Sequence, residues 1–384
     1  MSNFVVSARK YRPQRFDDVI GQNHIGHTLK NALQTNKLAH AFLFTGPRGV
    51  GKTTCARILA KVINCQNPIN QVEPCNQCTS CKSFNENASF NILELDAASN
   101  NSVEHIRTLI EQVRFQPQQG THKVFIIDEV HMLSTQAFNA FLKTLEEPPS
   151  YAIFILATTE KHKILPTILS RCQIFDFKRI QPSHIVEQLE IILKEQGRTA
   201  DPEALYQIGV KADGAMRDAL SIYDKIASAT EGHITYKDVT SNLNILDFEY
   251  FFKVTDTFTR SDVASAMLIF DDIIKHGFEP ELFIAGLSDH FRTLLLSKKP
   301  ETMSILDFSN DMKQRFYNQA SICTETLLLS GLNLLNQCDV FIPRATNKRL
   351  HVEVALMKLC QLGNIAEGDI FAMGEKKKNL TSPS

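Results

Sequence analysis

A glycine-rich stretch from Gly46 to Thr53 has the residue types and spacing of a phosphate-binding loop. Its sequence, GPRGVGKT, fits G-x-x-x-x-G-K-[ST]; an apolar stretch precedes it and a helical pattern follows it. Glycines let backbone N–H groups approach phosphate oxygens without an intervening Cβ, and a helix N-terminus attracts negative charge. We expect Lys52 to reach the β- and γ-phosphates and the Thr53 hydroxyl to ligate Mg²⁺. The residues expected to contact the nucleotide are Gly46, Gly49, Val50, Gly51, Lys52, Thr53 and Thr54.

An acidic pair, Asp128 and Glu129, follows a second apolar stretch. Residues 124–127 read Val-Phe-Ile-Ile, the pattern of a buried strand, and a parallel sheet presents ligands at the carboxyl ends of its strands. Asp128 is expected to hold Mg²⁺, directly or through water. Glu129 is a candidate general base for an attacking water. Beside the phosphate loop, this pair indicates hydrolysis of a nucleoside triphosphate rather than binding alone.

Four clustered cysteines, Cys65, Cys75, Cys78 and Cys81, follow the spacing C-x9-C-x2-C-x2-C. The C-x2-C steps can bring thiolates to one tetrahedral Zn²⁺, and four cysteines without a required histidine predict a closed structural site. Disulfides and free surface thiols are the alternatives; a reducing compartment disfavours the first, and oxidation disfavours the second. The other cysteines are scattered and are expected to be small core residues: Cys55, Cys172, Cys323, Cys338 and Cys360.

Strand and helix patterns alternate up to about residue 180. Apolar stretches predict strands at 40–44, 92–95, 124–127, 153–157 and 173–177. Helical patterns lie between them at 52–63, 102–114 and 134–146, the last with Ser134 as a candidate N-cap. Strands that alternate with helices indicate parallel βαβ units, so we expect an α/β domain with a parallel sheet flanked by helices.

Strand patterns disappear after Phe177. Asp201-Pro202 predicts a helix start with Asp201 as N-cap, and Asp213-Gly214 ends that helix before another at 215–228. Six further helical patterns lie at 245–258, 262–275, 279–297, 308–320, 324–340 and 345–362. We therefore expect a small helical unit followed by a second, all-α unit.

The charge composition excludes some classes of function. The 384 residues include 41 Lys and Arg against 42 Asp and Glu, a formal net charge of −1. That balance excludes a basic nucleic-acid packaging protein and an acidic solvating chain. It hides an asymmetry, +6 for residues 1–180 and −7 for residues 181–384. Neither a signal peptide nor an apolar run of about 20 residues is visible, which favours a cytoplasmic protein without membrane contact.

Five further segments carry a family resemblance. They read ARKYRPQRFDDVIGQ at 8–22, DEVHML at 128–133, LKTLEEPP at 142–149, SRC at 170–172 and GAMRDAL at 214–220. Together they resemble the gamma/tau subunits of bacterial DNA polymerase III, AAA+ ATPases that drive the sliding-clamp loader. The resemblance is dense over about residues 4–225, includes a four-cysteine zinc insertion at 65–81, and is one of architecture alone from 243 to 365.

The resemblance implies roles for residues whose spacing alone indicates none. Thr159 corresponds to the sensor 1 polar residue near the γ-phosphate, with Thr158 as the alternative. Arg171 corresponds to an arginine finger that acts on ATP in a neighbouring subunit. Arg217 corresponds to the sensor 2 arginine, which reaches ATP from a helical lid. The family's adenine-pocket segment is matched by Tyr11, Arg12, Pro13, Val19 and Ile20.

The resemblance also implies domains, cofactors and partners. It divides the chain into an AAA+ domain at 1–179, a helical lid at 180–242, a helical collar at 243–367 and a polar tail at 368–384. ATP, Mg²⁺ and Zn²⁺ are the implied cofactors. The implied partners are other loader subunits in a five-membered ring, the sliding clamp and primer–template DNA. ATP binding and hydrolysis are expected to open the clamp and load it onto primed DNA.

One segment departs from the family pattern. Family members often carry basic residues after the stretch that corresponds to Asp96–Ser99, whereas this chain has Asn100, Asn101 and Ser102. Uncharged donors at a helix N-terminus can still hold a phosphate, but this loop adds no positive charge to DNA affinity. Lys143, on the exposed face of helix 134–146, is a candidate substitute; a solvated lysine is the simpler interpretation.

Three alternative functions agree less well with these residues. Another AAA+ motor, such as a branch-migration helicase, would share the phosphate loop but not the cysteine insertion or the SRC motif. A nucleotide kinase with a zinc-bearing lid would not explain Asp128-Glu129 or the long helical C-terminal part. A scaffold subunit without catalysis would not require Lys52 and Thr53.

Overall fold

The computed structural model describes residues 5–100, 102–117, 120–243, 246–306, 308 and 310–362. The chain forms two compact units, the first extending to Asp238 and the second starting at Val239. The tail expected at 368–384 and the end of the expected collar, 363–367, lie outside the described residues.

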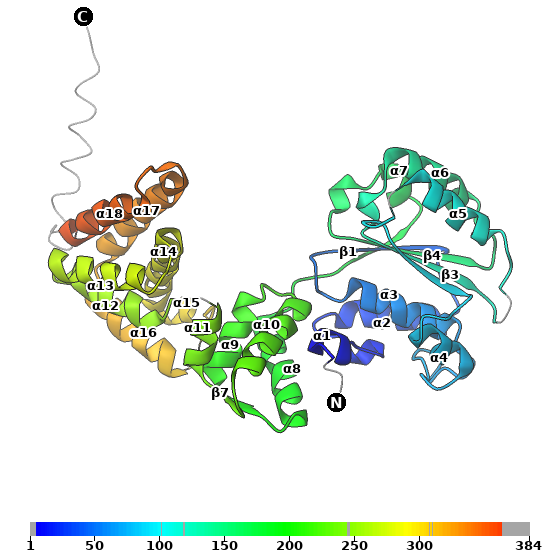
Figure 1. Ribbon diagram of the computed structural model, residues 1–384, viewed down its shortest axis with the longest axis horizontal. Coiled ribbons are helices and arrows are strands. Elements are labelled where there is room, and N and C mark those ends of the chain that lie inside the picture. The colour runs from blue at the N-terminus through cyan, green and yellow to red at the C-terminus, as the bar shows by residue number, and fades with distance from the viewer. Residues whose placement is uncertain are drawn as a thin grey trace, which may run out of the picture. The chain divides into compact units, whose positions relative to one another are not determined.

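A five-stranded parallel sheet forms the centre of the first unit (Figure 1). Its strands are β1 (Ala41–Thr45), β2 (Ile92–Asp96), β3 (Lys123–Asp128), β4 (Ala152–Thr158) and β5 (Gln173–Asp176). Their order is β2-β3-β4-β1-β5, and every neighbouring pair is parallel. The predicted α/β sheet is therefore confirmed. Strands β1, β3 and β4 are almost wholly buried because helices cover both faces of the sheet.

Alternate residues of each central strand supply two separate cores. Phe42 and Phe44 of β1 face the core formed with helices α2 (Asn23–Gln34) and α3 (Lys52–Ile63). Ala41 and Leu43 face the opposite core, formed with α5 (Val103–Val113) and α6 (Thr135–Glu146). Figure 1 shows these two helix pairs on opposite sides of the sheet. This arrangement follows from the two-residue period of a strand.

The helix predictions for the first unit are confirmed, and further helices are present. The Ser134 hydroxyl caps α6 by accepting a hydrogen bond from the backbone N–H of Ala137 at 3.3 Å. The sequence patterns missed α2 and α8 (Pro182–Glu195). The short helical elements are α1 (Ser7–Lys10), η1 (Phe16–Asp18), α4 (Thr79–Asn85), η2 (Val130–Met132), η3 (Lys161–Lys163) and α7 (Pro166–Leu169).

The region after β5 corrects two expectations. Helices α8, α9 (Pro202–Lys211), α10 (Met216–Ala229) and α11 (Tyr236–Leu243) are joined by a two-stranded parallel sheet. Its strands, β6 (Thr199–Ala200) and β7 (His233–Ile234), are too short to leave a sequence pattern, so the expectation of no strands after Phe177 was wrong.

Asp201 was also expected to cap α9 with its side chain, and it does not. Its carboxylate accepts hydrogen bonds from His233 Nε2 at 3.0 Å and from the backbone N–H of Tyr236 at 2.9 Å. Because this carboxylate is bound by His233 and Tyr236, Asp201 connects the start of α9 to the segment around β7 and does not cap the helix.

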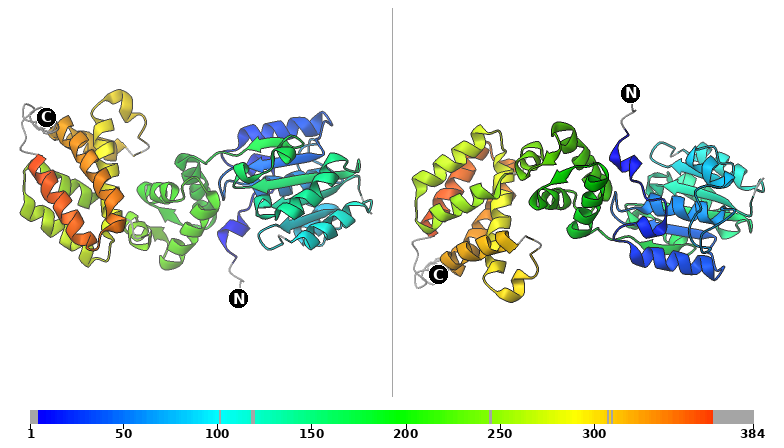
Figure 2. Two further views of the ribbon diagram at one scale, coloured as in Figure 1. Left: turned by 90° about the horizontal axis from the view of Figure 1, so that it is seen from above. Right: turned by 90° about the horizontal axis from the view of Figure 1, so that it is seen from below.

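The second unit is entirely helical in its described residues (Figure 2). Its helices are α12 (Phe248–Thr259), α13 (Val263–Lys275), α14 (Pro280–Ser297), α15 (Pro300–Met303), α16 (Asn310–Ile322), α17 (Glu325–Phe341), η4 (Ile342–Arg344) and α18 (Lys348–Leu362). Buried phenylalanines dominate its core: Phe251, Phe252, Phe258, Phe270, Phe283, Phe291 and Phe316.

One polar network crosses this aromatic core. Burial lowers the pKa of His290 to about 4, so the ring is neutral near pH 7. His290 Nε2 donates to Gln319 Oε1 at 2.7 Å, and Gln319 Nε2 donates to the carbonyl of Phe252 at 2.8 Å. The network therefore stabilises the packing of α12, α14 and α16.

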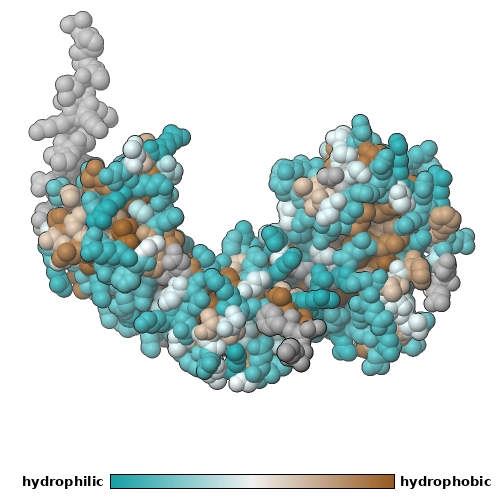
Figure 3. Space-filling model, viewed as in Figure 1, coloured by the Kyte–Doolittle hydropathy of each residue, from teal (hydrophilic) through white to brown (hydrophobic). Residues whose placement is uncertain are grey.

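The surface visible in Figure 3 is mostly hydrophilic. Among the residues that the structure describes, no helix combines the length and apolar character needed to cross a membrane. Cys55, Cys323, Cys338 and Cys360 are buried as expected for small core residues, whereas Cys172 is only partly buried.

We predict that Phe154→Ala weakens the sheet of the first unit. Phe154 is fully buried in β4, and its ring lies 5.3 Å from that of Phe125 and 5.1 Å from that of Phe141, measured between centroids. Truncation should lower the free energy of local unfolding by about 3–5 kcal/mol. Hydrogen–deuterium exchange of β3 and β4 measures this change. Phe90→Ala is the control because Phe90 is 78% exposed; equal effects of both substitutions would contradict the prediction.

Candidate functional site

The carboxyl ends of β1, β4 and β3 bring the predicted catalytic residues together. The three strands are neighbours in the order β3-β4-β1 and run in the same direction. The loop Gly46–Thr53 follows β1. Asp128 ends β3 and Glu129 comes next, and Thr158 ends β4 and Thr159 comes next. All of these side chains therefore start from one edge of the sheet, where ligands bind in open α/β folds.

The loop after β1 has a backbone that requires glycine. Gly46 has φ +144°, and a Cβ at this position would lie 2.4 Å from the carbonyl oxygen of Phe177. Lys52, the first residue of α3, is 5% exposed, and its Nζ donates to the carbonyls of Gly46 at 2.9 Å and Pro47 at 2.8 Å. Burial lowers the pKa of Lys52, while Glu129 and Asp128 act in the opposite direction.

The two expected magnesium ligands are in direct contact. The Thr53 hydroxyl donates to Asp128 Oδ2 at 2.6 Å, although the two residues are 75 positions apart in the chain. A hydroxyl and a carboxylate are hard oxygen ligands of the kind that Mg²⁺ prefers. One cation could therefore contact the Thr53 hydroxyl, the Asp128 carboxylate and phosphate oxygens at the same time.

Glu129 is held by residues from β4 and η2. It has the left-handed φ of +47°, and its Oε2 accepts from the backbone N–H of Thr159 at 3.2 Å and from the Thr159 hydroxyl at 3.0 Å. His131 Nδ1 lies 3.4 Å from the same carboxylate. Thr159 therefore controls where the Glu129 carboxylate points.

Thr158, the alternative to Thr159, has different partners. It is fully buried, and its hydroxyl interacts with His131 Nδ1 at 3.0 Å and accepts from the backbone N–H of Glu160 at 3.0 Å. Within the described residues, Thr158 makes these contacts around His131 rather than with Glu129. The hydroxyls of the two threonines thus have different hydrogen-bond partners, so substitutions can test them separately.

A pocket of about 510 Å³ opens beside these residues. Gly49, Val50, Gly51, Lys52, Thr53, Thr54, Asp128 and Glu129 line it. So do Tyr11, Arg12, Pro13, Val19 and Ile20, which we call the N-terminal wall. This volume is in the range of small-molecule sites. Gly46 and Thr159 are not among the lining residues, although both contact residues that are.

Arg217 reaches this pocket from the helical region after β5. It lies in the first turn of α10, and its Cβ is 3.4 Å from the position that a Cβ on Gly49 would occupy. Ala215 approaches the same position at 2.9 Å, so only glycine at position 49 leaves room for this contact. The phosphate loop and the start of α10 therefore pack against each other.

Cations line the pocket, and the hydrogen-bond partners of Lys52 and Arg12 are neutral. Arg12 donates from Nε to the Thr54 hydroxyl at 3.4 Å, a neutral partner. Burial lowers the pKa of Arg12, and repulsion from Arg57 adds to the shift. With the buried Lys52 and the exposed Arg217, the partly buried Arg12 gives the pocket a positively charged lining that favours an anionic ligand such as a polyphosphate, because cations withdrawn from water gain most from a nearby negative charge.

Arg171 does not line this pocket. It follows α7, and its Nη2 lies 2.7 Å from Glu146 Oε1 at the end of α6. Its Nη1 donates to the carbonyl of Thr167 at 2.7 Å and to the Ser170 hydroxyl at 3.2 Å. A role for Arg171 therefore requires a ligand other than the one in the pocket of its own chain.

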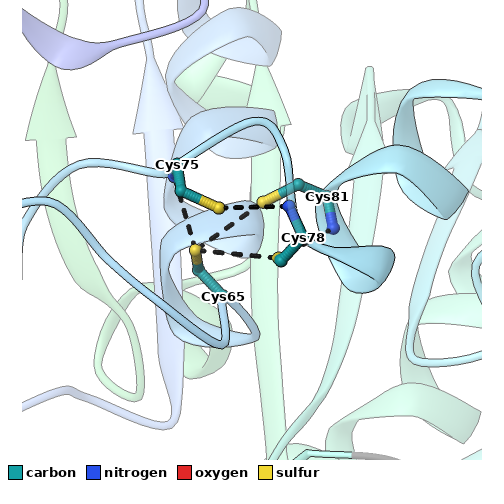
Figure 4. A group of neighbouring side chains, drawn as sticks. All are labelled: Cys65, Cys75, Cys78 and Cys81. Atoms are coloured by element: carbon teal, nitrogen blue, oxygen red, sulfur yellow. Dashed lines mark hydrogen bonds between the residues drawn. The ribbon is translucent and has the colours of Figure 1, made fainter.

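The four clustered cysteines converge on one point (Figure 4). Their sulfur atoms all lie within 4.8 Å of one another, with 3.7 Å from Cys81 to Cys65 and 4.0 Å from Cys65 to Cys78. A tetrahedral ion with metal–sulfur bonds of about 2.3 Å separates its ligands by about 3.8 Å. The cluster thus fits a four-coordinate metal.

Backbone N–H groups point at these sulfurs and favour the thiolate form. Cys75 Sγ accepts from Cys78 at 3.3 Å and from Gln77 at 3.5 Å. The bond from Gln77 is the main cause that lowers the pKa of Cys75 to about 6, whereas burial raises the pKa values of Cys65 and Cys81. A thiolate is the form that binds metal, so the turn from Cys75 to Cys78 favours the metal-binding form of Cys75.

Known families match most of the chain from residue 21 onward. The family described as DNA polymerase III, delta subunit, matches residues 21–181. The ATPase lid domain of the DNA polymerase III clamp loader subunit matches 184–232, and domain III of DNA polymerase III subunits gamma and tau matches 234–369.

Curated relatives agree with these matches. The gamma subunit of DNA polymerase III from Buchnera aphidicola is 41% identical over 279 residues, which cover 73% of this chain and 77% of the relative. The chain belongs to the DNA polymerase III gamma/tau family. The tau subunit of Bacillus subtilis is 40% identical over 94% of this chain, and that of Escherichia coli is 36% identical over 93%. This gamma/tau family member spans 64% and 55% of the length of those two tau subunits.

The segment that departs from the family pattern is partly described in this gamma/tau family member. Asn100 Nδ2 donates to the carbonyl of Asp96 at 3.1 Å, and the Ser102 hydroxyl caps α5 by accepting from His105 N–H at 3.4 Å. Asn101 lies outside the described residues. Lys143 is exposed on α6, and its part in DNA binding stays a prediction.

Sequence reasoning missed several residues around the pocket. His131 contacts Glu129, Thr158 and Glu160, and Gln188 and Ser221 line the pocket from α8 and α10. His131 lies inside the DEVHML segment, which was a usable signal. Gln188 and Ser221 carry no such signal, because only the packing of the helical region brings them to the pocket.

We predict that the purified protein contains about one metal ion per chain and that Cys78→Ser removes it. Serine keeps the size of the side chain but does not supply the soft thiolate ligand that completes the tetrahedron. Elemental analysis after extensive dialysis measures the metal content. Cys172→Ser is the control because this cysteine lies outside the cluster. A wild-type protein without metal, or equal metal content in Cys78→Ser, would contradict the prediction.

Proposed function

We propose that this chain is the ATPase motor subunit of a DNA polymerase III clamp loader. ATP binding and hydrolysis in its pocket drive opening of the sliding clamp and its loading onto primed DNA. The observation that carries this proposal is the contact between Thr53 and Asp128 beside Lys52 and Glu129, in a chain that belongs to the gamma/tau family. The phosphate loop supports ATP binding, and the acidic pair supports hydrolysis.

Each residue at the sheet edge has a part in the proposed reaction. Lys52 leaves the carbonyls of Gly46 and Pro47 and binds the β- and γ-phosphates. Thr53 and Asp128 hold Mg²⁺, which neutralises phosphate charge. Glu129 orients a water for attack on the γ-phosphorus and accepts its proton. Since the Thr159 hydroxyl donates to Glu129, we assign the sensor 1 role to Thr159.

The N-terminal wall and the lid complete the nucleotide site in this proposal. The N-terminal wall contacts the base, and Arg217 binds phosphate from α10. Because Gly49 packs against Ala215 and Arg217, a change at the phosphates alters the angle of the lid. This coupling gives ATP a means to change the subunit's shape.

The activity of the assembled loader depends on neighbouring subunits. In the proposed five-membered ring, Arg171 leaves Glu146 and stabilises transition-state charge on ATP in the adjacent subunit. The second, helical unit forms the collar of the ring, and the ring binds the clamp and primer–template DNA. The same proposal divides the chain into an AAA+ domain that ends at residue 179, a lid that ends at 242, a collar that ends at 367 and a tail.

Zinc is the metal that we propose for Cys65, Cys75, Cys78 and Cys81. Four thiolates in a closed tetrahedron favour Zn²⁺ and leave no open position for catalysis. The metal therefore supports the fold of the insertion. Clustered thiols of this kind persist in a reducing compartment, which agrees with a replication protein of the cytoplasm.

Substitution of Lys52 or Arg171 tests the proposed function. Lys52→Ala should weaken ATP binding, because it removes the cation that contacts the phosphates. Arg171→Ala should leave ATP binding intact and lower turnover stimulated by clamp and primed DNA about 10³-fold, as for other arginine fingers. Turnover is measured in a reconstituted loader. Arg114→Ala, an exposed arginine after α5, is the matched control. Unchanged turnover in both Lys52→Ala and Arg171→Ala would overturn the proposal.

The pair Thr159→Val and Thr158→Val distinguishes the two sensor 1 candidates. Thr159→Val removes the hydroxyl bound to Glu129, so it should lower the single-turnover hydrolysis rate at least tenfold, with about 1.4 kcal/mol lost per factor of ten. Thr158→Val should mainly lower stability, by about 1–3 kcal/mol, because it removes the buried hydroxyl that accepts from Glu160 N–H. A larger rate effect of Thr158→Val would transfer the sensor role to Thr158.

A further inference from the structure

Lys61 is a buried lysine whose partners in the described structure are all neutral. It lies near the end of α3, the helix that starts with Lys52, and is 3% exposed. Its Nζ donates to three amide oxygens, those of Gln14 at 2.7 Å, Asn76 at 2.8 Å and Asn85 at 3.5 Å. An ammonium group has three N–H donors, so these acceptors use all of them. Lys61 therefore connects protein segments and has no donor left for a ligand.

The three acceptors come from separate parts of the fold. Asn76 lies in the turn between Cys75 and Cys78, and Asn85 ends α4, the helix that carries Cys81. Gln14 directly follows Arg12-Pro13 of the N-terminal wall. One side chain thus joins the four-cysteine insertion to the segment that lines the nucleotide pocket.

Gln14 continues this connection toward the pocket. While its Oε1 accepts from Lys61, its Nε2 donates to the carbonyl of Arg12 at 3.2 Å. Arg12 in turn donates from Nε to the hydroxyl of Thr54, which also lines the pocket. A series of hydrogen-bonded residues, Lys61, Gln14 and Arg12, therefore connects Asn76 in the cysteine insertion to Thr54 in the pocket.

Glu73 makes a second, independent connection. It lies two residues before Cys75 and is 6% exposed. Its Oε2 accepts from the backbone N–H of Phe16 at 2.9 Å, and its Oε1 lies 2.7 Å from Lys30 Nζ on α2. Phe16 stands between the two parts of the N-terminal wall, Tyr11–Pro13 and Val19–Ile20. The insertion is therefore connected to the N-terminal segment at two places, Gln14 (through Lys61) and Phe16, which both lie between the two parts of the N-terminal wall.

We propose that the four-cysteine insertion positions the N-terminal wall of the nucleotide pocket, through Lys61 and Glu73, so that metal binding by the cysteines raises nucleotide affinity. The proposal rests on the proposed ATPase function of the pocket. Metal coordination fixes the turn that carries Asn76. Without the metal this loop is less ordered, and the conformational entropy lost when nucleotide binding orders it lowers the affinity for nucleotide. Four thiolates with one Zn²⁺ carry a net charge of about −2, which Lys61 partly balances. Lys61 and Glu73 are positioning residues, since neither lines the pocket.

The affinity of the full chain for ADP in the presence of Mg²⁺, measured by calorimetry, tests this inference. Chelation of the metal should raise the Kd about tenfold, the size expected for loss of one hydrogen bond to a charged group. Lys61→Met should raise the Kd similarly while the metal content stays at one ion per chain. Chelation should raise the Kd of Lys61→Met by a smaller factor than that of wild type, because Lys61→Met already lacks one of the two connections that metal loss weakens.

Two further variants keep the test decisive. Asn76→Gly removes the amide that accepts from Lys61 and tolerates the φ of +57° at this position, so it serves if Lys61→Met fails to fold. Lys82→Met is the matched control: it removes the same charge from an exposed position on α4 and should leave the Kd unchanged. An unchanged Kd after verified metal loss, or in both Lys61→Met and Asn76→Gly, overturns the inference.

A failure of the proposed function gives a different result. In that case the wild-type protein with its metal does not bind ADP, or Lys52→Ala binds it as well as wild type does. Binding that is normal in wild type, lost in Lys52→Ala and insensitive to metal would instead overturn the positioning role alone. Circular dichroism of each sample verifies that the fold is retained.

Discussion

The contact between Thr53 and Asp128 depends on the shared direction and register of three strands. β1 and β3 are not neighbours; β4 lies between them, and only a parallel arrangement ends all three at one edge. Because side chains alternate along a strand, a shift of one residue in β3 would exchange Val124 and Ile126 with Phe125 and Ile127 between the two cores. Packing on both faces therefore holds Asp128 in place, and Thr158 and Thr159 follow from the position of β4.

Buried cations form the second constraint on the first unit. Lys52, Arg12 and Lys61 have neutral hydrogen-bond partners, and burial lowers the pKa of each. In the proposed function a polyphosphate ligand compensates the first two, whereas amide oxygens of the protein accept the hydrogen bonds of Lys61. The net charge of −1 conceals this local excess, because electrostatic attraction in a desolvated pocket depends on the nearest charges and not on their total.

The four-cysteine insertion contacts the rest of the first unit at several points. Besides Lys61 and Glu73, Arg57 of α3 forms an ion pair with Glu94 and stacks on Phe84 of α4, with its guanidinium 4.4 Å from the ring centroid. From Arg57 onward α3 thus contacts the insertion and α4, while its first residues belong to the phosphate loop. The cysteine cluster and the pocket therefore pack against the same helix.

The sequence by itself determined which residues are candidates for the proposed chemistry, because the relevant signals are local. The loop Gly46–Thr53, the pair Asp128-Glu129 and the cysteine spacing each lie within one short stretch, and the alternation of strands and helices indicated the parallel sheet. Tertiary structure alone decided which distant groups meet. Glu129 with Thr159, Arg171 with Glu146, Lys61 with Gln14, and Asp201 with His233 are contacts across 25 or more positions. A single sequence carries no pattern for such pairs, since each is selected by packing of elements that are far apart in the chain. The strands β6 and β7 have two residues each, too few to form a sequence pattern, so only their pairing in the structure identifies them.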